Sequence, residues 1–220
     1  EWQLRVAAGE ALPMTQDELV IDGHAVEARV YSENPQKKFL PATGTLHRLR
    51  PPKEGPHLRV DTGVREGDEV SMYYDPMIAK LIVWDRDRAS ALRRLHDALE
   101  RYEIAGVITN VNFLAAVAAH PAFAAGELET GFIDKHKDDL IPAPGAVPDR
   151  ALALACLDLL LARQGHAAAA DPYSPWAQVD GWRLNDQGHD ELSFRDGGDD
   201  GDILVTVHYP SAGGYRLDLP

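Results

Sequence analysis

An arginine and a glutamate two residues apart offer the clearest chemistry in the chain. The run GHAVEARVYSE at residues 23–33 alternates in polarity, which is typical of a half-buried strand. Glu27 and Arg29 fall on the face opposite the apolar one. A guanidinium held on a strand can clamp a carboxylate or stabilise a developing oxyanion, and a neighbouring carboxylate can orient it. The same spacing also suits a solvated ion pair that contributes little.

The other residue types that do chemistry form no second recognisable site. The nine histidines contain no HExxH motif and no pair at helical i, i+4 spacing, so no metal site is expected. The acidic run at 196–202 lacks the spacing and the terminal glutamate of a calcium loop, and it is interpreted as a solvated turn. The single cysteine, Cys156, cannot form a disulfide within the chain.

The charge balance argues against two classes of partner. The 220 residues carry a formal net charge of −13, whereas nucleic acids and anionic membrane surfaces bind basic faces. The longest apolar run, residues 151–162, contains Asp158 and is too short to span a bilayer. A hydrophobic fraction of 45% is sufficient to build a core.

Further strands are expected around the strand that carries Arg29. A loop with two prolines follows it, and short strands are predicted at residues 45–49 and 58–61. Residues 64–84 alternate turn residues with apolar runs, which predicts a short strand, a tight turn and a long apolar strand.

Three helices are expected after these strands. The first begins at one of two candidate caps, Asp85 or Asp87, and the second is Val111–Ala119 with Asn110 at its N-cap. A last short helix is predicted near residues 132–140. The buried stripe of the first helix is predicted to be Leu92, Leu95, Leu99 and Tyr102. Helices follow strands without a regular βαβ rhythm, so the fold class is α+β.

A Pro- and Gly-rich segment divides the chain. Residues 142–148 are expected to link a first region, 1–141, to a second region, 149–220. The first region starts without methionine at what looks like the interior of a helix that ends at Gly9. We therefore expect the chain to be a piece of a longer protein.

The second region is predicted to be a helix followed by an antiparallel β meander. Asp149 should cap the helix, which ends near Arg163 with Gly165 as its stop. The strands are predicted at residues 178–184, 191–195, 203–208 and 215–219. Because the helix is apolar almost all round, it must be covered on several sides, either by a small barrel folded round it or by another subunit. Tyr173, Trp176 and Trp182 are expected in the core of that barrel or at an interface.

Four consecutive stretches of the first region resemble the C-terminal region of biotin carboxylases. They are residues 23–44, 64–84, 86–114 and 132–142. Residues 149–220, through DPYSPWAQVDGWRLN, more weakly resemble the middle region of 3-methylcrotonyl-CoA carboxylase α subunits, and geranyl-CoA carboxylase α subunits are similar. The resemblance implies a biotin carboxylase C-terminal subdomain, then a helix and a β-barrel that contacts the β subunit.

The resemblance also implies a reaction and its partners. ATP and bicarbonate carboxylate biotin, and a carboxyltransferase β subunit then passes the carboxyl group to an acyl-CoA. The family's ATP and Mg²⁺ site would lie mostly upstream of this chain, and biotin would sit on a carrier domain outside it, so the chain alone should be inactive. Propionyl- and acetyl-CoA carboxylases are alternatives, and so is a non-catalytic dimerisation and subunit-docking fragment. The location would be the bacterial cytoplasm, or the mitochondrial matrix in a eukaryote.

The matched positions imply roles for individual residues. Arg29 corresponds to an arginine that faces biotin in the active site, with Glu27 in support. Phe132 and Ile133 fall where the family contributes apolar contacts near adenine, and core packing is the alternative. Arg59 falls where biotin carboxylases make homodimer contacts.

One lysine resembles a modification site without being expected to serve as one. The hairpin around Lys80 is similar to the carrier domains that bear biotin, in which the modified lysine stands at a tight turn. Here Lys80 follows Met77 by three residues, inside an apolar strand pattern. It is therefore interpreted as a structural residue.

Overall fold

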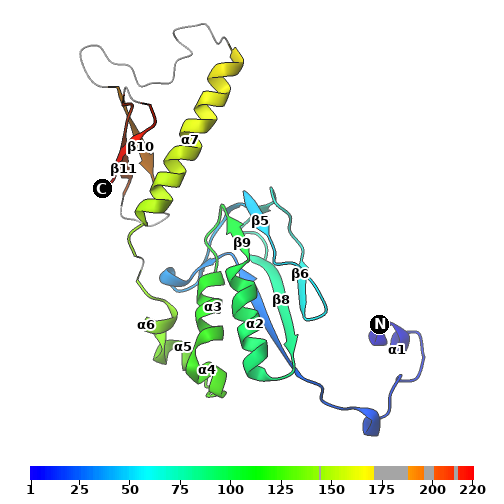
Figure 1. Cartoon of the computed structure of the whole chain (residues 1–220). Helices are drawn as coiled ribbons and strands as arrows, with labels where there is room; N and C mark the ends of the chain where they lie inside the picture. Colours follow the sequence, from blue (N-terminus) through cyan, green and yellow to red (C-terminus); the bar gives the residue numbers. More distant parts are fainter. Residues whose placement is uncertain (144, 171–187, 196–200, 211–212) are drawn as a thin grey trace. The chain divides into compact units, whose positions relative to one another are not determined.

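The computed structural model describes residues 1–143, 145–170, 188–195, 201–210 and 213–220, with only the backbone described for residues 164–170. By their contacts the residues divide into two units, Glu1–Ala143 and Pro144–Pro220 (Figure 1). In the described residues, no helix is long and apolar enough to cross a membrane.

The alternating run becomes β1, His24–Tyr31, at the edge of a three-stranded antiparallel sheet. The long apolar strand β8, Met77–Asp85, lies in the middle, and β6, Leu58–Thr62, closes the order β1-β8-β6. Ala28 and Val30 are buried while Glu27 and Arg29 are exposed, which confirms the predicted two faces of the strand. The β1–β8 register shifts between Val30 and Tyr31.

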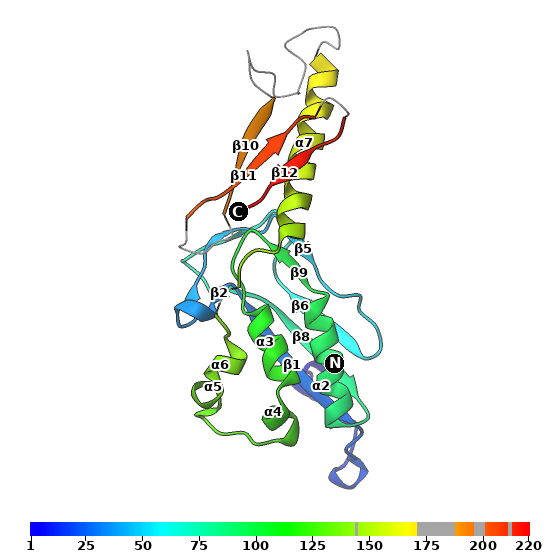
Figure 2. The same ribbon diagram turned by 60° about the vertical axis from the view of Figure 1, so that its left-hand side comes forward.

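Two helices cover the apolar face of this sheet (Figures 1 and 2). Helix α2, Arg88–Glu100, begins at Asp87, whose side chain accepts from the Ser90 N–H at 2.7 Å. Asp85, the other candidate cap, instead forms an ion pair with Arg94 at 2.6 Å. The predicted stripe is confirmed, because all four of its members are buried. Helix α3 is Val111–Ala119, with the predicted bounds.

Short strand pairs complete the first unit. They are β2, Glu33–Asn34, with β3, Leu40–Pro41; β4, Gly44–Thr45, with β7, Glu69–Val70; and β5, Arg48–Arg50, with β9, Glu103–Ala105. The single strand predicted at residues 45–49 is wrong, because its two ends pair with different partners. Leu46 and His47 interrupt the strand between these two ends, and the Leu46 side chain is fully buried.

The first unit also contains six short helical segments among the described residues. They are α1, Trp2–Ala7; η1, Gln16–Glu18; η2, Pro35–Lys37; α4, Pro121–Ala125; α5, Phe132–Lys135; and α6, Lys137–Leu140. The helix predicted at residues 132–140 is in fact two, because His136 leaves helical geometry at φ −113° and ψ 23°. Gly9, at φ 89°, follows α1 as predicted.

The second unit pairs one long helix with an open sheet. Helix α7, Asp149–Ala170, places Leu152, Cys156 and Leu160 one turn apart. These three side chains are buried with Leu192, Val205 and Val207 of the sheet. The predicted stop at Gly165 is wrong, since the helix continues through it. A helical glycine costs only about 1 kcal/mol relative to alanine, and four alanines that favour helix follow here.

The sheet of the second unit has the order β10-β11-β12. Its strands are β10, His189–Phe194, β11, Ile203–His208, and β12, Arg216–Asp218, all antiparallel. Within the described residues the sheet is open and forms no closed barrel. The strand predicted at 178–184, with Tyr173, Trp176 and Trp182, lies outside the described residues.

Candidate functional site

Arg29 projects from the polar face of β1 with a side chain that is 63% exposed. Its Nε lies 3.5 Å from Oε1 of Glu27. Tyr31 continues the same face, because strand side chains repeat every second residue. The interaction with Tyr31, and then that with Glu27, raises the pKa of Arg29 above its ordinary value. The site therefore presents a permanent positive charge that is open to solvent. The side chains on either side of it on the same strand face, Glu27 and Tyr31, interact with it.

The polar face continues from Arg29 across the two neighbouring strands. Arg29 is paired in register with Lys80 of β8, and Lys80 is paired with Asp61 of β6. The Lys80 Nζ lies 3.2 Å from Asp61 Oδ2, so this lysine is held inside a sheet by an ion pair. That placement agrees with its interpretation as a structural residue.

Arg59 belongs to the same set of charges. Its Nε and Nη2 donate to the two carboxylate oxygens of Asp61 at 2.7 and 3.0 Å. Arg59, followed by Lys80, lowers the pKa of Asp61, although partial burial opposes them. Arg59 is still 71% exposed, so its guanidinium faces outward while the carboxylate fixes its direction.

The sequence pointed to Asn110 only as a helix N-cap, whereas the structure gives its side chain a different role. It is only 5% exposed and stands at the predicted N-cap position, but its side chain makes no capping bond. Instead, Oδ1 accepts from the Tyr31 N–H at 2.9 Å and Nδ2 donates to the Arg29 carbonyl at 3.1 Å. The Asn110 N–H also donates to the Tyr31 carbonyl at 3.1 Å. We call these three bonds the Asn110 clamp, which fixes β1 at the point where its register shifts.

Phe132 and Ile133 lie apart from this sheet face, at the start of α5. Phe132 is 7% exposed, and its ring packs against His120, Phe123 and His136. Ile133 is 41% exposed. Phe132 therefore packs inward, whereas Ile133 is exposed enough to contact a ligand.

Comparison with known families identifies the class of protein to which these features belong. The family model described as the biotin carboxylase C-terminal domain matches residues 27–135, which include most of β1, all of β6 and β8, and Asn110. The model described as the BT domain of the methylcrotonyl-CoA carboxylase alpha-subunit matches residues 148–220. The class is thus that of the biotin-dependent carboxylases.

Individual relatives narrow that class. The mitochondrial methylcrotonoyl-CoA carboxylase subunit alpha of Dictyostelium discoideum is 48% identical over 97% of this chain. Its namesake in Mus musculus is 42% identical over the whole chain. The chain belongs to the family of methylcrotonyl-CoA carboxylase α subunits. It spans 30% and 31% of the lengths of these two relatives.

Solved structures agree on the fold of the first unit. The biotin carboxylase domain of thermophilic 2-oxoglutarate carboxylase, bound to bicarbonate, is 37% identical with a TM-score of 0.62 and covers 64% of this chain. The biotin carboxylase subunit of pyruvate carboxylase gives the same identity and score over 65% of this chain. The chain covers 32% of each of those chains.

Proposed function

We propose that the chain is part of an α subunit that carboxylates biotin with ATP and bicarbonate, for transfer to 3-methylcrotonyl-CoA. The observation that carries this proposal is the order of the two matched domains, together with 48% identity across nearly the whole chain to a methylcrotonoyl-CoA carboxylase subunit alpha. Geranyl-, propionyl- and acetyl-CoA carboxylases are alternative subtypes. A propionyl-CoA carboxylase alpha chain from Ruegeria pomeroyi is 45% identical over 60% of this chain.

Arg29 is proposed to contact the reacting groups. Bicarbonate is an anion, and biotin, when bound, supplies the ureido nitrogen that takes up the carboxyl group. An exposed guanidinium with a raised pKa is suited to holding one anion and stabilising negative charge on its neighbour. Glu27 orients that guanidinium. The Asn110 clamp sets the position of the backbone that carries it.

The remaining site residues receive supporting roles. Ile133, exposed at α5, is proposed as an apolar contact near the adenine of ATP, with Phe132 packed behind it. Most of the ATP and Mg²⁺ site is assigned to the protein outside residues 1–220. Arg59 is proposed to contact a second copy of the α subunit, since its guanidinium is exposed and already aimed by Asp61.

The second unit is proposed to dock the carboxyltransferase β subunit. Four leucines of α7 are between 41% and 58% exposed, although the helix is rich in apolar residues. They are Leu154, Leu157, Leu159 and Leu161. We propose that they are covered by a β-barrel closed round α7, by the β subunit, or by both. The biotin carrier domain is assigned to the protein beyond this chain.

The proposed domain limits are 1–141, a linker at 142–148, and 149–220. The boundary between the two structural units at Ala143 and Pro144 supports them, as do the limits of the matched family models at 135 and 148. The proposed location is the cytoplasm of a bacterium or the mitochondrial matrix of a eukaryote. The relatives named above are mitochondrial by name.

The test uses the full-length α subunit purified with its β subunit. Labelled bicarbonate, ATP and Mg²⁺ are supplied with 3-methylcrotonyl-, geranyl-, propionyl- or acetyl-CoA, and acid-stable label is counted. We expect 3-methylcrotonyl-CoA to be preferred. Preference for another acyl-CoA would keep the class and reject the subtype. Absence of ATP-dependent fixation with every acyl-CoA would reject the catalytic proposal in favour of a dimerisation and docking fragment.

A further inference from the structure

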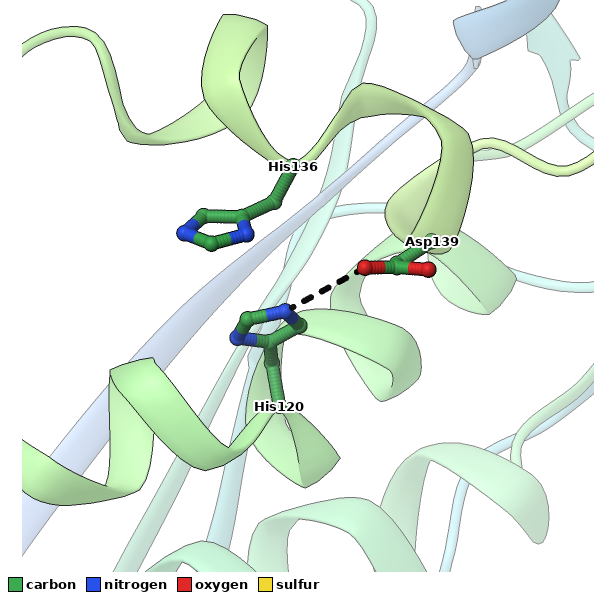
Figure 3. Close-up of side chains that lie close together, drawn as sticks. All are labelled: His120, His136 and Asp139. Atoms are coloured by element: carbon green, nitrogen blue, oxygen red, sulfur yellow. Dashed lines mark ion pairs between the residues drawn. The ribbon is translucent and has the colours of Figure 1, made fainter.

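Three side chains with metal-ligand chemistry meet where the short helices of the first unit join (Figure 3). His120 precedes α4, His136 separates α5 from α6, and Asp139 lies in α6. Each offers a ligand atom within 4.8 Å of the other two. The His120 Nε2 is 3.8 Å from Asp139 Oδ2, and the two imidazole ring centroids are 4.3 Å apart.

Packing holds the two imidazoles in place. The His120 side chain is only 12% exposed, and its ring meets the Phe132 ring edge-on at 5.4 Å. The His136 ring lies 4.9 Å from the same phenyl ring. The backbone of His136 is fixed as well, because its N–H donates to the Phe132 carbonyl at 3.1 Å and its carbonyl accepts from the Leu140 N–H at 3.0 Å. Both imidazole rings therefore pack against the same phenyl ring, that of Phe132.

Asp139 is the accessible ligand of the three. The Asp139 side chain is 75% exposed, so it can rotate toward the rings and leaves a path for an ion to enter. Ligand distances of about 2.0–2.2 Å are needed around zinc, so the three ligand atoms, which lie within 4.8 Å of one another, must move closer together when the ion binds.

The set of ligands selects a class of ion. Two imidazole nitrogens and one carboxylate suit Zn²⁺ and the neighbouring transition metals Co²⁺, Ni²⁺ and Cu²⁺. Mg²⁺ and Ca²⁺ prefer sites made of oxygen atoms, so the ion that accompanies ATP is poorly matched to this one. Three protein ligands leave a fourth position for water.

A proton competes for the same position. The Nδ1 of His120 lies 3.3 Å from the Ala122 N–H and accepts from it, so the neutral ring carries its proton on Nε2, toward Asp139. A neutral imidazole that binds a metal through Nε2 carries its proton on Nδ1, so the His120 tautomer must change and the long bond from the Ala122 N–H is lost. Metal binding therefore exchanges one weak capping bond for coordination.

We propose that His120, His136 and Asp139 bind one divalent transition-metal ion, Zn²⁺ foremost, which ties α6 to the start of α4. The site is separate from the polar sheet face that carries Arg29. It does not depend on the proposed carboxylase activity.

The test is metal binding by the full-length α subunit, freed of metal with a chelator and kept without ATP. Equilibrium dialysis against Zn²⁺ counts bound ions, and the visible absorption of added Co²⁺ reports four-coordinate geometry. We expect His136→Asn to bind one equivalent less than the native protein. Asp139→Asn should weaken that equivalent by at least about tenfold, since even residues that only support metal ligands commonly change affinity by 10–100-fold.

Matched controls separate this site from adventitious binding and from unfolding. Asp138→Asn removes the neighbouring carboxylate of α6, and His47→Asn removes an exposed histidine elsewhere. Both should bind Zn²⁺ like the native protein, and the circular dichroism of all four variants should match it. Equal stoichiometry and affinity in the native protein and in correctly folded His136→Asn and Asp139→Asn would overturn the proposal.

Discussion

The side-chain amide of Asn110 donates to the backbone carbonyl of Arg29 at 3.1 Å, across 81 residues of sequence. The same amide accepts from the N–H of Tyr31, so one buried side chain satisfies backbone groups on both sides of Val30. The clamp joins the first residue before α3 to the strand that carries the proposed catalytic guanidinium. The orientation of Arg29 therefore depends on a residue that never reaches the polar face.

Replacing Asn110 by aspartate should loosen that strand. The substitution preserves size but sets a second oxygen against the Arg29 carbonyl, and an unmet buried polar group costs about 1–3 kcal/mol. We expect the urea midpoint to fall and the turnover number for bicarbonate fixation to fall with it. Asn112→Asp, on the exposed side of α3, is the matched control and should change neither. Unchanged stability and turnover in Asn110→Asp would show that the clamp is dispensable.

Replacing Arg29 should lower turnover without lowering stability. Its side chain is largely exposed and its contact with Glu27 is long at 3.5 Å, so Arg29→Gln should leave the unfolding midpoint nearly unchanged. Loss of one group that stabilises developing negative charge typically lowers turnover by about 10²–10³-fold. Fixation of labelled bicarbonate by the full complex measures this. Arg86→Gln, which is 83% exposed, should retain native turnover. A fully active Arg29→Gln would remove Arg29 from the reaction.

Two adjacent leucines of α7 should report different properties. Leu160 is 2% exposed in the core of the second unit, so Leu160→Ala should destabilise that unit by about 2–5 kcal/mol. Leu161 is 54% exposed, and Leu161→Asp should instead weaken co-purification with the β subunit at nearly native stability. Native β-subunit binding by Leu161→Asp would show that this position lies outside the docking surface.

Tyr102 should make the first unit sensitive to alkali. Burial raises the pKa of its phenol to about 12, and its hydroxyl has no hydrogen-bond partner among the described residues. The unfolded chain loses this proton near pH 10 and the folded one only near pH 12, so ionisation favours unfolding as the pH rises through that window. Tyr102→Phe should reduce the loss of stability between pH 9 and 11, measured by urea unfolding. Tyr74→Phe, at an 87% exposed tyrosine, should not.

Sequence predicted best those elements in which buried and exposed residues recur with the period of a strand or a helix. Glu27 and Arg29 alternate with Ala28 and Val30, and the stripe of α2 repeats at helical spacing, so each pattern records which face meets the core. The four stretches that resemble biotin carboxylases are likewise recognised from residues adjacent in sequence, without knowledge of contacts. They agree with the family model matched at residues 27–135.

Features that depend on distant partners were not accessible in this way. The division of strand 45–49 follows from its partners β7 and β9, and Gly106 shows how tight that arrangement is. A Cβ on Gly106, which has φ 109°, would meet the Thr45 carbonyl oxygen at 1.9 Å. The Asn110 clamp and the meeting of His120 with His136 also depend on contacts between residues far apart in sequence. No local pattern encodes them.

The register shift in β1 has a consequence for how this protein tolerates insertions and deletions. Side chains on a strand repeat with a period of two, so a one-residue slip would turn Arg29 inward and bring an apolar neighbour out. The shift lies between Val30 and Tyr31, directly beside the residues that Asn110 holds. A single-residue deletion between residues 24 and 28 would therefore move the residues before it to the opposite face of the sheet, whereas Arg29, next to the Asn110 clamp, would keep its outward side.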